Sequence, residues 1–277
     1  MAIIRELESG VWLDDVVLPD DIRRDAESLC RLLSDCVADL VVSLSMFEHA
    51  QIASRAHMQA RSQHGLDHEE WERDGQRRRT REAELEAEAG ITWGTPGYFE
   101  KSEAIRERVR REMLREKWER EGGPEAYKHR VPFIHAQSFV STLAVLQRSL
   151  IAIAEYAFDL PTKAQLERAC NDFAAALPGL KDVRDSIAHI EERVRTEARG
   201  RKITTQPVSN SMIHAPQGGV MIINALNNQH FGGTIADGTY VEVEVADATT
   251  EVACAAVQAV FNALPWQPGH RRVEPSY

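Results

Sequence analysis

Cysteine is scarce in this sequence, and its few cysteines are far apart. The four are Cys30, Cys36, Cys170 and Cys254, and no two of them have the Cys-x-x-Cys spacing typical of structural zinc sites. They also do not form the dense disulfide framework on which small secreted domains depend. We therefore expect buried, unpaired thiols in a reducing compartment, and no bound metal or other cofactor.

Secretion signals and long apolar runs are lacking as well. The first residues do not combine a basic stretch with an apolar core, as a signal peptide does. No apolar run is long enough to predict a segment that spans a bilayer. These absences predict a cytoplasmic protein that has no membrane partner.

The sequence has no excess of positive charge. Its formal net charge is -10 and its pI is near 5.5. A surface that coats nucleic acid unselectively is therefore excluded, and any RNA site must be a local basic patch whose binding is sensitive to salt. No nucleophile elbow, kinase signature or dinucleotide fingerprint occurs. The hypothesis of a nucleotide-handling transferase is therefore the weaker one, because the sequence contains no phosphate-binding motif.

Apolar residues at helical spacing predict four principal helices. The first follows Pro19-Asp20-Asp21 and ends near His64, with a buried stripe formed by Leu29, Leu33, Cys36, Val37, Leu40, Leu44 and Phe47. The second begins at Val131-Pro132 and ends near Phe158, and its broad apolar face is typical of a central helix. The third has a capping-box pattern at Thr162-Lys163-Ala164-Gln165 and ends near Leu177. The fourth follows the break at Pro178-Gly179 and continues to about Arg199.

A charged insertion at about residues 65–130 divides this bundle. The stretches Asp67 to Ala89 and Lys101 to Glu121 favour helices, and Gly90 to Gly97 forces a loop between them. One interpretation is a solvated helical hairpin or a partly mobile segment. The alternative is a surface for RNA or a partner protein, weakened by acidic neighbours and lined by Arg77, Arg78, Arg79, Arg81 and the arginines from Arg106 to Arg120.

After Gly200 the pattern changes to short strands. Val220 to Ala225, Phe231 to Ile235 and Thr239 to Val245 predict an antiparallel meander, with a hairpin turn at Asp237-Gly238. Asp247 is expected to cap a last helix that ends near Leu264, and the residues from Pro265 are expected to form a tail. The predicted fold class is therefore mainly α. A helical bundle occupies residues 1–200, and residues 201–277 form a small β-meander plus helix that packs on the bundle.

The segment from Val183 to Val194 carries the clearest candidate for chemistry. On one continuous helix, its apolar residues fall within a narrow stripe formed by Val183, Ile187, Ile190 and Val194. Asp185 and His189, four residues apart, then point away from that stripe, and Arg184 lies on its flank. Small Ala188 leaves room for the arginine to lean toward the imidazole. We expect a cationic and titratable pair on a face that the core of the monomer does not use.

The spacing Arg184-x4-His189, with a polar residue directly after the arginine, resembles the R-x4-6-H signature of the HEPN superfamily. The resemblance covers residues 132–199 well and the rest of the chain loosely. It implies a HEPN-like helical bundle, often a homodimer, and a metal-independent endoribonuclease of toxin–antitoxin or antiphage systems. In such a dimer, two motif helices bring two arginines and two histidines into one cleft. An antitoxin or defence-system partner is a further implication.

The resemblance also assigns roles. His189 is the general base or acid, and Arg184 clamps the phosphate, while Asp185 orients one of the two. Ser186 is a further candidate for contact with substrate, and Arg193 and Arg195 are the candidate residues for RNA binding. So few groups are sufficient because the attacking 2′-hydroxyl belongs to the substrate and is already tethered beside the phosphorus.

Other interpretations of these residues remain open. Arg184 and His189 are equally compatible with a solvated helix face, or with a dimer seam in a non-catalytic module that mediates assembly or senses a ligand. His57, His64 and His68, with Asp67 between the last two, are possible zinc ligands, but Gly65 interrupts their helix and solvated polar residues are favoured. His135 lies beside an apolar stripe and is interpreted as a structural residue.

Overall fold

The structure is a computed structural model that describes residues 4–15, 18–63, 68–156, 158–269 and 271–275. Within these residues the chain forms eight helices and short antiparallel strands, so the predicted mainly α class is confirmed. The chain divides into two compact units. We call Met1–His49 with Pro132–Tyr277 the bundle unit, and Ala50–Val131 the hairpin unit.

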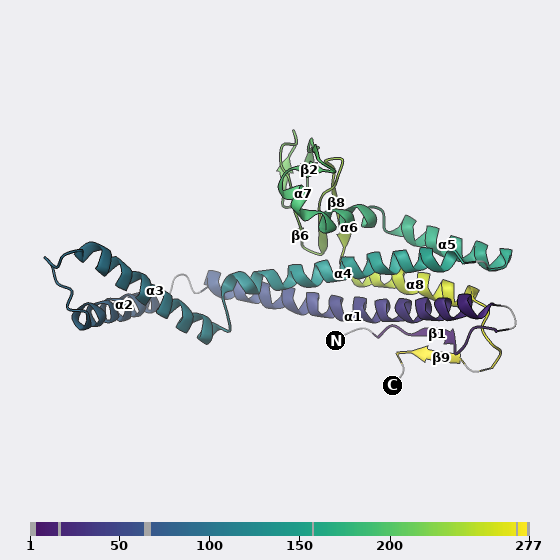
Figure 1. Ribbon diagram of the computed structural model, residues 1–277, viewed down its shortest axis with the longest axis horizontal. Helices are drawn as coiled ribbons and strands as arrows, with labels where there is room; N and C mark the ends of the chain where they lie inside the picture. The colour runs from purple at the N-terminus through teal and green to yellow at the C-terminus, as the bar shows by residue number, and fades with distance from the viewer. Residues whose placement is uncertain (1–3, 16–17, 64–67, 157, 270, 276–277) are drawn as a thin grey trace. The chain divides into compact units, whose positions relative to one another are not determined.

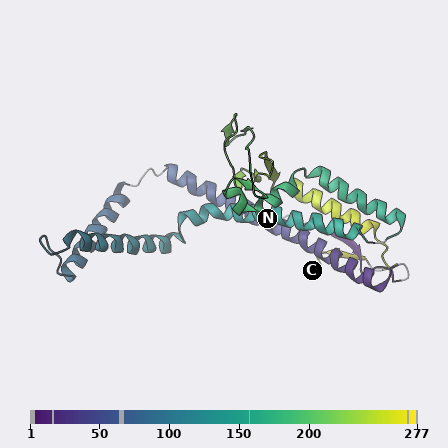
Figure 2. The same cartoon turned by 45° about the horizontal axis from the view of Figure 1, so that its top comes forward.

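Four long helices contribute to the bundle unit: α1 (Asp20–Gln63), α4 (Glu125–Ala154), α5 (Leu160–Ala176) and α8 (Asp247–Ala263). The part of α1 after His49 and the part of α4 before Pro132 belong to the hairpin unit. Within the bundle unit the four helices lie alongside one another (Figures 1 and 2). The predicted stripe of α1 is buried from Leu33 to Phe47, whereas Leu29 is half-buried at its edge. The apolar face of α4 is buried in the same core, as its broad apolar pattern predicted.

Helix α4 begins earlier than the sequence predicted. It starts at Glu125, so Pro132 lies inside the helix rather than in its first turn, and the boundary between the units falls at this proline. By length and composition α4 is also apolar enough to span a membrane, which the sequence analysis did not expect. Half of its most apolar window is buried in the protein, and a core helix meets the same criterion.

The cap of α5 differs from the predicted capping box. Asp159 is the N-cap residue, and its Oδ1 accepts a hydrogen bond from the backbone N–H of Thr162 at 2.8 Å. Pro161 lies in the first turn, where a missing N–H donor is harmless. The hydrogen bonds from Thr162 lower the pKa of the Asp159 carboxyl. Thr162 is therefore a residue of the first turn, and the helix starts closer to α4.

The β-meander is present but shorter than predicted. Strands β6 (Ala225–Asn227), β7 (His230–Thr234) and β8 (Tyr240–Glu244) form an antiparallel sheet, with Phe231 paired to Val243. Residues 220–224 are not a strand. Phe231, Val243 and Val245 belong to the same core as the helices, so residues 201–277 are part of the bundle unit.

Three small strand pairs were not predicted. The strands β2 (Glu197–Ala198) and β3 (Arg201–Lys202) form one short hairpin, and β4 (Val208–Ser209) and β5 (His214–Ala215) form another. The third pair joins the two ends of the chain, because β1 (Leu7–Gly10) is antiparallel to β9 (Arg271–Glu274). The prediction that residues from Pro265 form a tail was therefore wrong.

The hairpin unit contains α2 (His68–Glu88) and α3 (Tyr98–Glu121), close to the predicted bounds. The two helices pack against each other through Leu85 and Val109, and Ser102 donates a hydrogen bond of 2.5 Å to Glu86. Ion pairs between the helices join Arg77 to Glu116 at 2.7 Å and Arg81 to Glu112 at 3.5 Å. The helices α2 and α3 thus form a charged helical hairpin with a small apolar core.

Candidate active site on helices α6 and α7

The motif helix starts at a position that requires glycine. Gly179 precedes α6 (Leu180–Ala188) and has a φ of 82°, in the left-handed region. A Cβ on Gly179 would also lie 2.4 Å from Cγ1 of Val241 in β8. The close approach packs the beginning of α6 directly on the meander, where Leu180 and Val183 are buried.

The predicted continuous helix breaks at His189. This residue ends α6 with a φ of -117° and a ψ of 39°, and the short helix α7 (Ile190–Val194) follows. The backbone N–H of His189 donates to the carbonyl of Asp185 at 3.1 Å. The prediction of one continuous apolar stripe was therefore wrong: Val183 is buried, whereas Ile190 and Val194 are 36% and 66% exposed.

A buried arginine explains the direction that α7 takes. Arg193 is only 4% exposed, and its Nε donates to Oγ of Ser186 at 3.1 Å while Nη1 donates to the carbonyl of Glu197 at 2.7 Å. Oγ of Ser186 donates in turn to the carbonyl of Thr234 in β7 at 2.8 Å. These bonds tie α7 to α6, β2 and β7. Since Arg193 occupies the inward face of α7, Ile190 and Val194 face outward.

Two residues that the sequence assigned to substrate contact are therefore internal. Ser186 and Arg193 are buried, and their side chains form hydrogen bonds with each other and with backbone carbonyls. A group whose donors are already satisfied in the interior is not presented to an RNA strand. We leave Ser186 and Arg193 out of the candidate site and regard them as its support.

Arg184 and Asp185 form a local ion pair at the surface of α6. Nε of Arg184 donates to Oδ1 of Asp185 at 2.9 Å, and Nη2 donates to the same oxygen. Both side chains are half-buried. A guanidinium has five N–H donors, so the pair orients Arg184 and leaves donors that face away from Asp185.

His189 is exposed at the junction between α6 and α7. Within the described residues, Arg184 and His189 form no hydrogen bond or ion pair with each other. One protomer therefore presents the two groups on neighbouring turns but does not join them. The exposed Ile190 directly follows His189 in the chain and the exposed Val194 ends the same short helix, so apolar side chains adjoin the candidate residues.

A basic turn next to α7 was missed by the sequence analysis. Arg195 is 64% exposed and lies 3.8 Å from Glu197, and Nζ of Lys202 donates to the carbonyl of Arg195 at 3.0 Å. Arg199 and Arg201 are exposed in the same β2–β3 hairpin. The signal for this turn is Gly200 within the Arg-Gly-Arg-Lys run, which starts at Arg199, where the fourth helix was predicted to end.

The other candidates do not form a second chemical centre in the described part of the chain. His64 and Asp67 lie outside the described residues, as do the side chains of His57 and His68. Among the residues that are described, no three His, Cys, Asp or Glu side chains are placed to hold a metal ion. The four cysteines are unpaired, and burial raises the pKa of Cys30 to about 12 and that of Cys36 to about 11, so both remain protonated thiols.

Comparison with known proteins does not identify a relative. No protein-family model, no curated protein and no solved structure matches this chain. The function must therefore be inferred from the geometry of α6 and α7 and from the chemistry of their side chains.

Proposed function

We propose that this protein is a metal-independent endoribonuclease of HEPN type that acts in the cytoplasm as a homodimer. The observation that carries the proposal is the arrangement around the end of α6. A guanidinium oriented by a carboxylate, Arg184 with Asp185, precedes the exposed imidazole of His189 by about one turn. The surface that adjoins them is apolar and unpartnered at Ile190 and Val194.

The chemistry needs only these groups and the RNA. The imidazole of His189 from one protomer takes the proton of the 2′-hydroxyl, and the 2′-oxygen attacks the adjacent phosphorus. The bond from phosphorus to the 5′-oxygen breaks, and His189 of the second protomer gives a proton to that leaving oxygen. Arg184 stabilises the negative charge on the equatorial oxygens in the transition state. The products are a 2′,3′-cyclic phosphate and a 5′-hydroxyl.

A homodimer supplies what one protomer lacks. Complete burial of an exposed branched side chain contributes about 1.5–3 kcal/mol, and Ile190 and Val194, which are 36% and 66% exposed, gain a part of this when a partner buries them. A two-fold axis near these residues brings two copies of Arg184 and His189 to one cleft. The exposed Arg195 and the β2–β3 turn, with Arg199, then extend the positive charge along the RNA. A cellular role as a toxin or antiphage effector belongs to the same proposal, with an antitoxin or defence protein as regulator.

The second candidate function is a non-catalytic HEPN-like module that mediates assembly. The observation that favours it is the same ion pair, because Arg184 is already neutralised by Asp185 within its own protomer. In that case Arg184 stabilises the surface of α6 and His189 contacts a partner without moving a proton.

Cleavage of RNA in EDTA separates the two functions. Purified protein is expected to cut RNA without divalent metal and to leave 2′,3′-cyclic phosphate ends, detected by mass spectrometry. His189→Ala is expected to lower the rate by at least about 100-fold, since a general acid or base contributes that much. His49→Ala is the matched control, because His49 is also exposed but lies on α1.

Two results would contradict the nuclease proposal. One is cleavage that requires Mg²⁺, and the other is an unchanged rate in His189→Ala whose circular dichroism matches the parent protein. A protein that does not cut RNA, but whose assembly changes on substitution of Arg184, would establish the non-catalytic module.

A further inference from the structure

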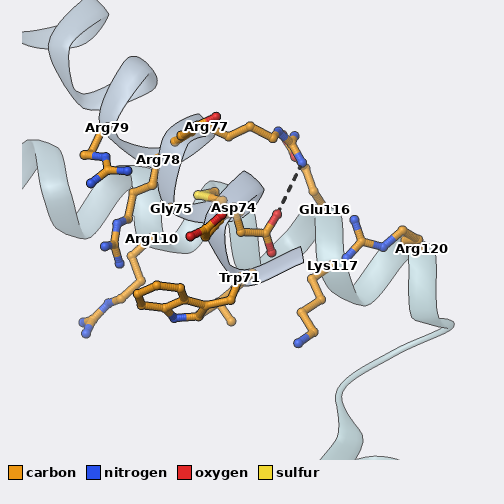
Figure 3. Close-up of a pocket in the computed structure, with 14 residues that line it drawn as sticks. Trp71, Asp74, Gly75, Arg77, Arg78, Arg79, Arg110, Glu116, Lys117 and Arg120 are labelled. Atoms are coloured by element: carbon orange, nitrogen blue, oxygen red, sulfur yellow. Dashed lines mark hydrogen bonds and ion pairs between the residues drawn. The ribbon is translucent and has the colours of Figure 1, made fainter. Parts of the chain in front are cut away.

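A cavity between the two helices of the hairpin unit has no role in the site described above. Its volume is about 550 Å³, and both α2 and α3 line it (Figure 3). Six cations contribute to the wall: Arg77, Arg78, Arg79, Arg110, Lys117 and Arg120. A cavity of this size accommodates a small organic group such as a nucleotide.

The charge of this cavity is opposite to that of the protein. Its six cations face three carboxylates, those of Glu72, Asp74 and Glu116, so the lining has an excess of three positive charges, whereas the whole chain has a net charge of -10. Acidic residues occur in both halves of α2, and two of them, Glu72 and Asp74, are in the lining. The excess of positive charge at the cavity comes from the arginines that follow on α2 and from the basic residues of α3.

The ion pairs around the cavity neutralise it only in part. Arg77 is bound to Glu116 at 2.7 Å, and Lys117 lies 3.8 Å from Glu121. Arg78 lies 3.8 Å from Glu82, and Arg110 forms an ion pair with Glu107, so an RNA phosphate competes with these carboxylates. Arg79 is exposed and has no hydrogen bond or ion pair within the described residues. A guanidinium without a partner, beside other cations, is stabilised by an added anion.

An exposed tryptophan lies among these cations. Trp71 is 67% exposed, although its large apolar surface favours burial. Figure 3 shows its indole between the side chains of Arg110 and Lys117. A flat ring beside arginines is the combination with which proteins bind single-stranded nucleic acids, because bases stack on the ring while the cations follow the phosphates.

We propose that this cavity binds single-stranded RNA, with a base stacked on Trp71 and phosphates on Arg78, Arg79 and Arg110. The inference deepens the proposed function and rests on it, because it places a second contact with the same substrate in the hairpin unit. A duplex keeps its bases stacked inside the helix and offers no free ring to Trp71. An acidic peptide offers carboxylates but no base. Single-stranded RNA offers both a base for Trp71 and phosphates for the arginines.

Fluorescence anisotropy tests the proposal without any cleavage. The full-length His189→Ala protein is titrated against a fluorescein-labelled oligouridylate of about 12 nucleotides, a length within the range of known single-strand sites. Trp71→Ala is expected to weaken binding roughly tenfold through the lost stack. Arg79→Gln is expected to weaken binding severalfold and to reduce the slope of log K against log salt by about 0.7, the contribution of one phosphate contact.

The matched control is Arg115→Gln. Arg115 is an exposed arginine of α3 that does not line the cavity and forms no hydrogen bond or ion pair within the described part of the chain. Its removal is expected to leave both the affinity and the salt slope nearly unchanged. Because neither Trp71 nor Arg79 is buried, the variants are expected to retain the circular dichroism of the parent protein.

Three outcomes would overturn the inference. Equal losses in Arg79→Gln and Arg115→Gln would indicate diffuse attraction to the hairpin unit, with no site. Unchanged affinity in Trp71→Ala would remove the stacked base, and equal displacement of the RNA by polyglutamate would assign the cavity to an acidic protein. RNA binding that depends on Trp71 in a protein that never cuts RNA would retain the cavity while the proposed nuclease fails.

Discussion

Arg193 is a charged side chain in the interior of the bundle unit, and its surroundings account for that placement. Burial of a guanidinium costs free energy unless its donors find acceptors. Ser186 and the carbonyl of Glu197 supply acceptors at 3.1 and 2.7 Å, and Glu192 lies 3.6 Å away. These partners lie on three separate elements, so a single residue fixes how α7 and β2 sit against α6.

This network gives a prediction at the scale of one residue. Arg193→Ala is expected to lower the free energy of unfolding by about 2–4 kcal/mol, because two hydrogen bonds from a charged group are lost and a space remains. Arg195→Ala, two positions away and exposed, is expected to change it by less than about 0.5 kcal/mol. Urea denaturation measures both values. Equal effects of the two substitutions would show that Arg193 does not support the site.

At the scale of elements, the described part of the hairpin unit has many paired charges and few buried apolar side chains. Glu107 and Glu112 on α3 have pKa values below their ordinary value of 4.5. The hydrogen bond from Arg111 is the largest cause for Glu107, and the bond from Arg108 is the largest for Glu112. Glu112 also reaches Arg81 on α2 at 3.5 Å, so its charge contributes to the contact between the helices.

The lowered pKa of Glu112 predicts how the helix pair responds to pH. A carboxyl group whose pKa is lower in the folded state stabilises that state fully above its unfolded pKa, and the contribution is lost as the pH falls through the folded value. We expect Glu112→Gln to increase proteolysis within α2 and α3 at neutral pH. The difference from the parent protein should shrink as the pH falls below the ordinary glutamate value of 4.5 and should disappear once the pH is below the lowered pKa of Glu112.

The control for this prediction is Glu119→Gln. Glu119 is exposed on α3 and has no ion pair within the described part of the chain. Its substitution is expected to leave proteolysis at neutral pH unchanged. If both variants were cleaved at the parent rate at every pH, the ion pairs between α2 and α3 would contribute nothing to the hairpin, as many exposed pairs do.

For the whole molecule, a helix could be predicted where apolar residues recur at helical spacing over many turns and those apolar residues form the core. The stripe from Leu33 to Phe47 and the bounds of α2 and α3 followed from spacing, glycines and charge alone. The pairing of β1 with β9 did not, because it joins Leu7 to Glu274 and no local pattern encodes so distant a contact.

The candidate site was predictable only as a set of residues. Spacing singled out Arg184, Asp185 and His189, and the structure leaves them at the surface. The helical spacing did not predict the break at His189. That break accompanies the hydrogen bond from Arg193 to Ser186, and Ser186 in turn donates to the carbonyl of Thr234 in a distant strand. A tertiary contact of this kind overrides the helical period of Ile190 and Val194.

The proposed dimer is the feature of the whole molecule on which the proposed catalysis depends. If Val194 is buried between two protomers, an aspartate in its place opposes association, and Val194→Asp should weaken the dimer roughly tenfold or more. Leu160→Asp is the matched control, because Leu160 is also exposed but lies at the start of α5. Analytical ultracentrifugation measures the association of both variants.

The most direct test of the central claim is the rate of metal-free RNA cleavage per chain, measured across the concentration range in which the dimer forms. The rate is expected to rise with the fraction of dimer, to fall in Val194→Asp in proportion to its lost association, and to be absent from a His189→Ala protein that still dimerises. A rate per chain that is independent of concentration, or a His189→Ala dimer that cuts RNA as the parent does, would contradict the account.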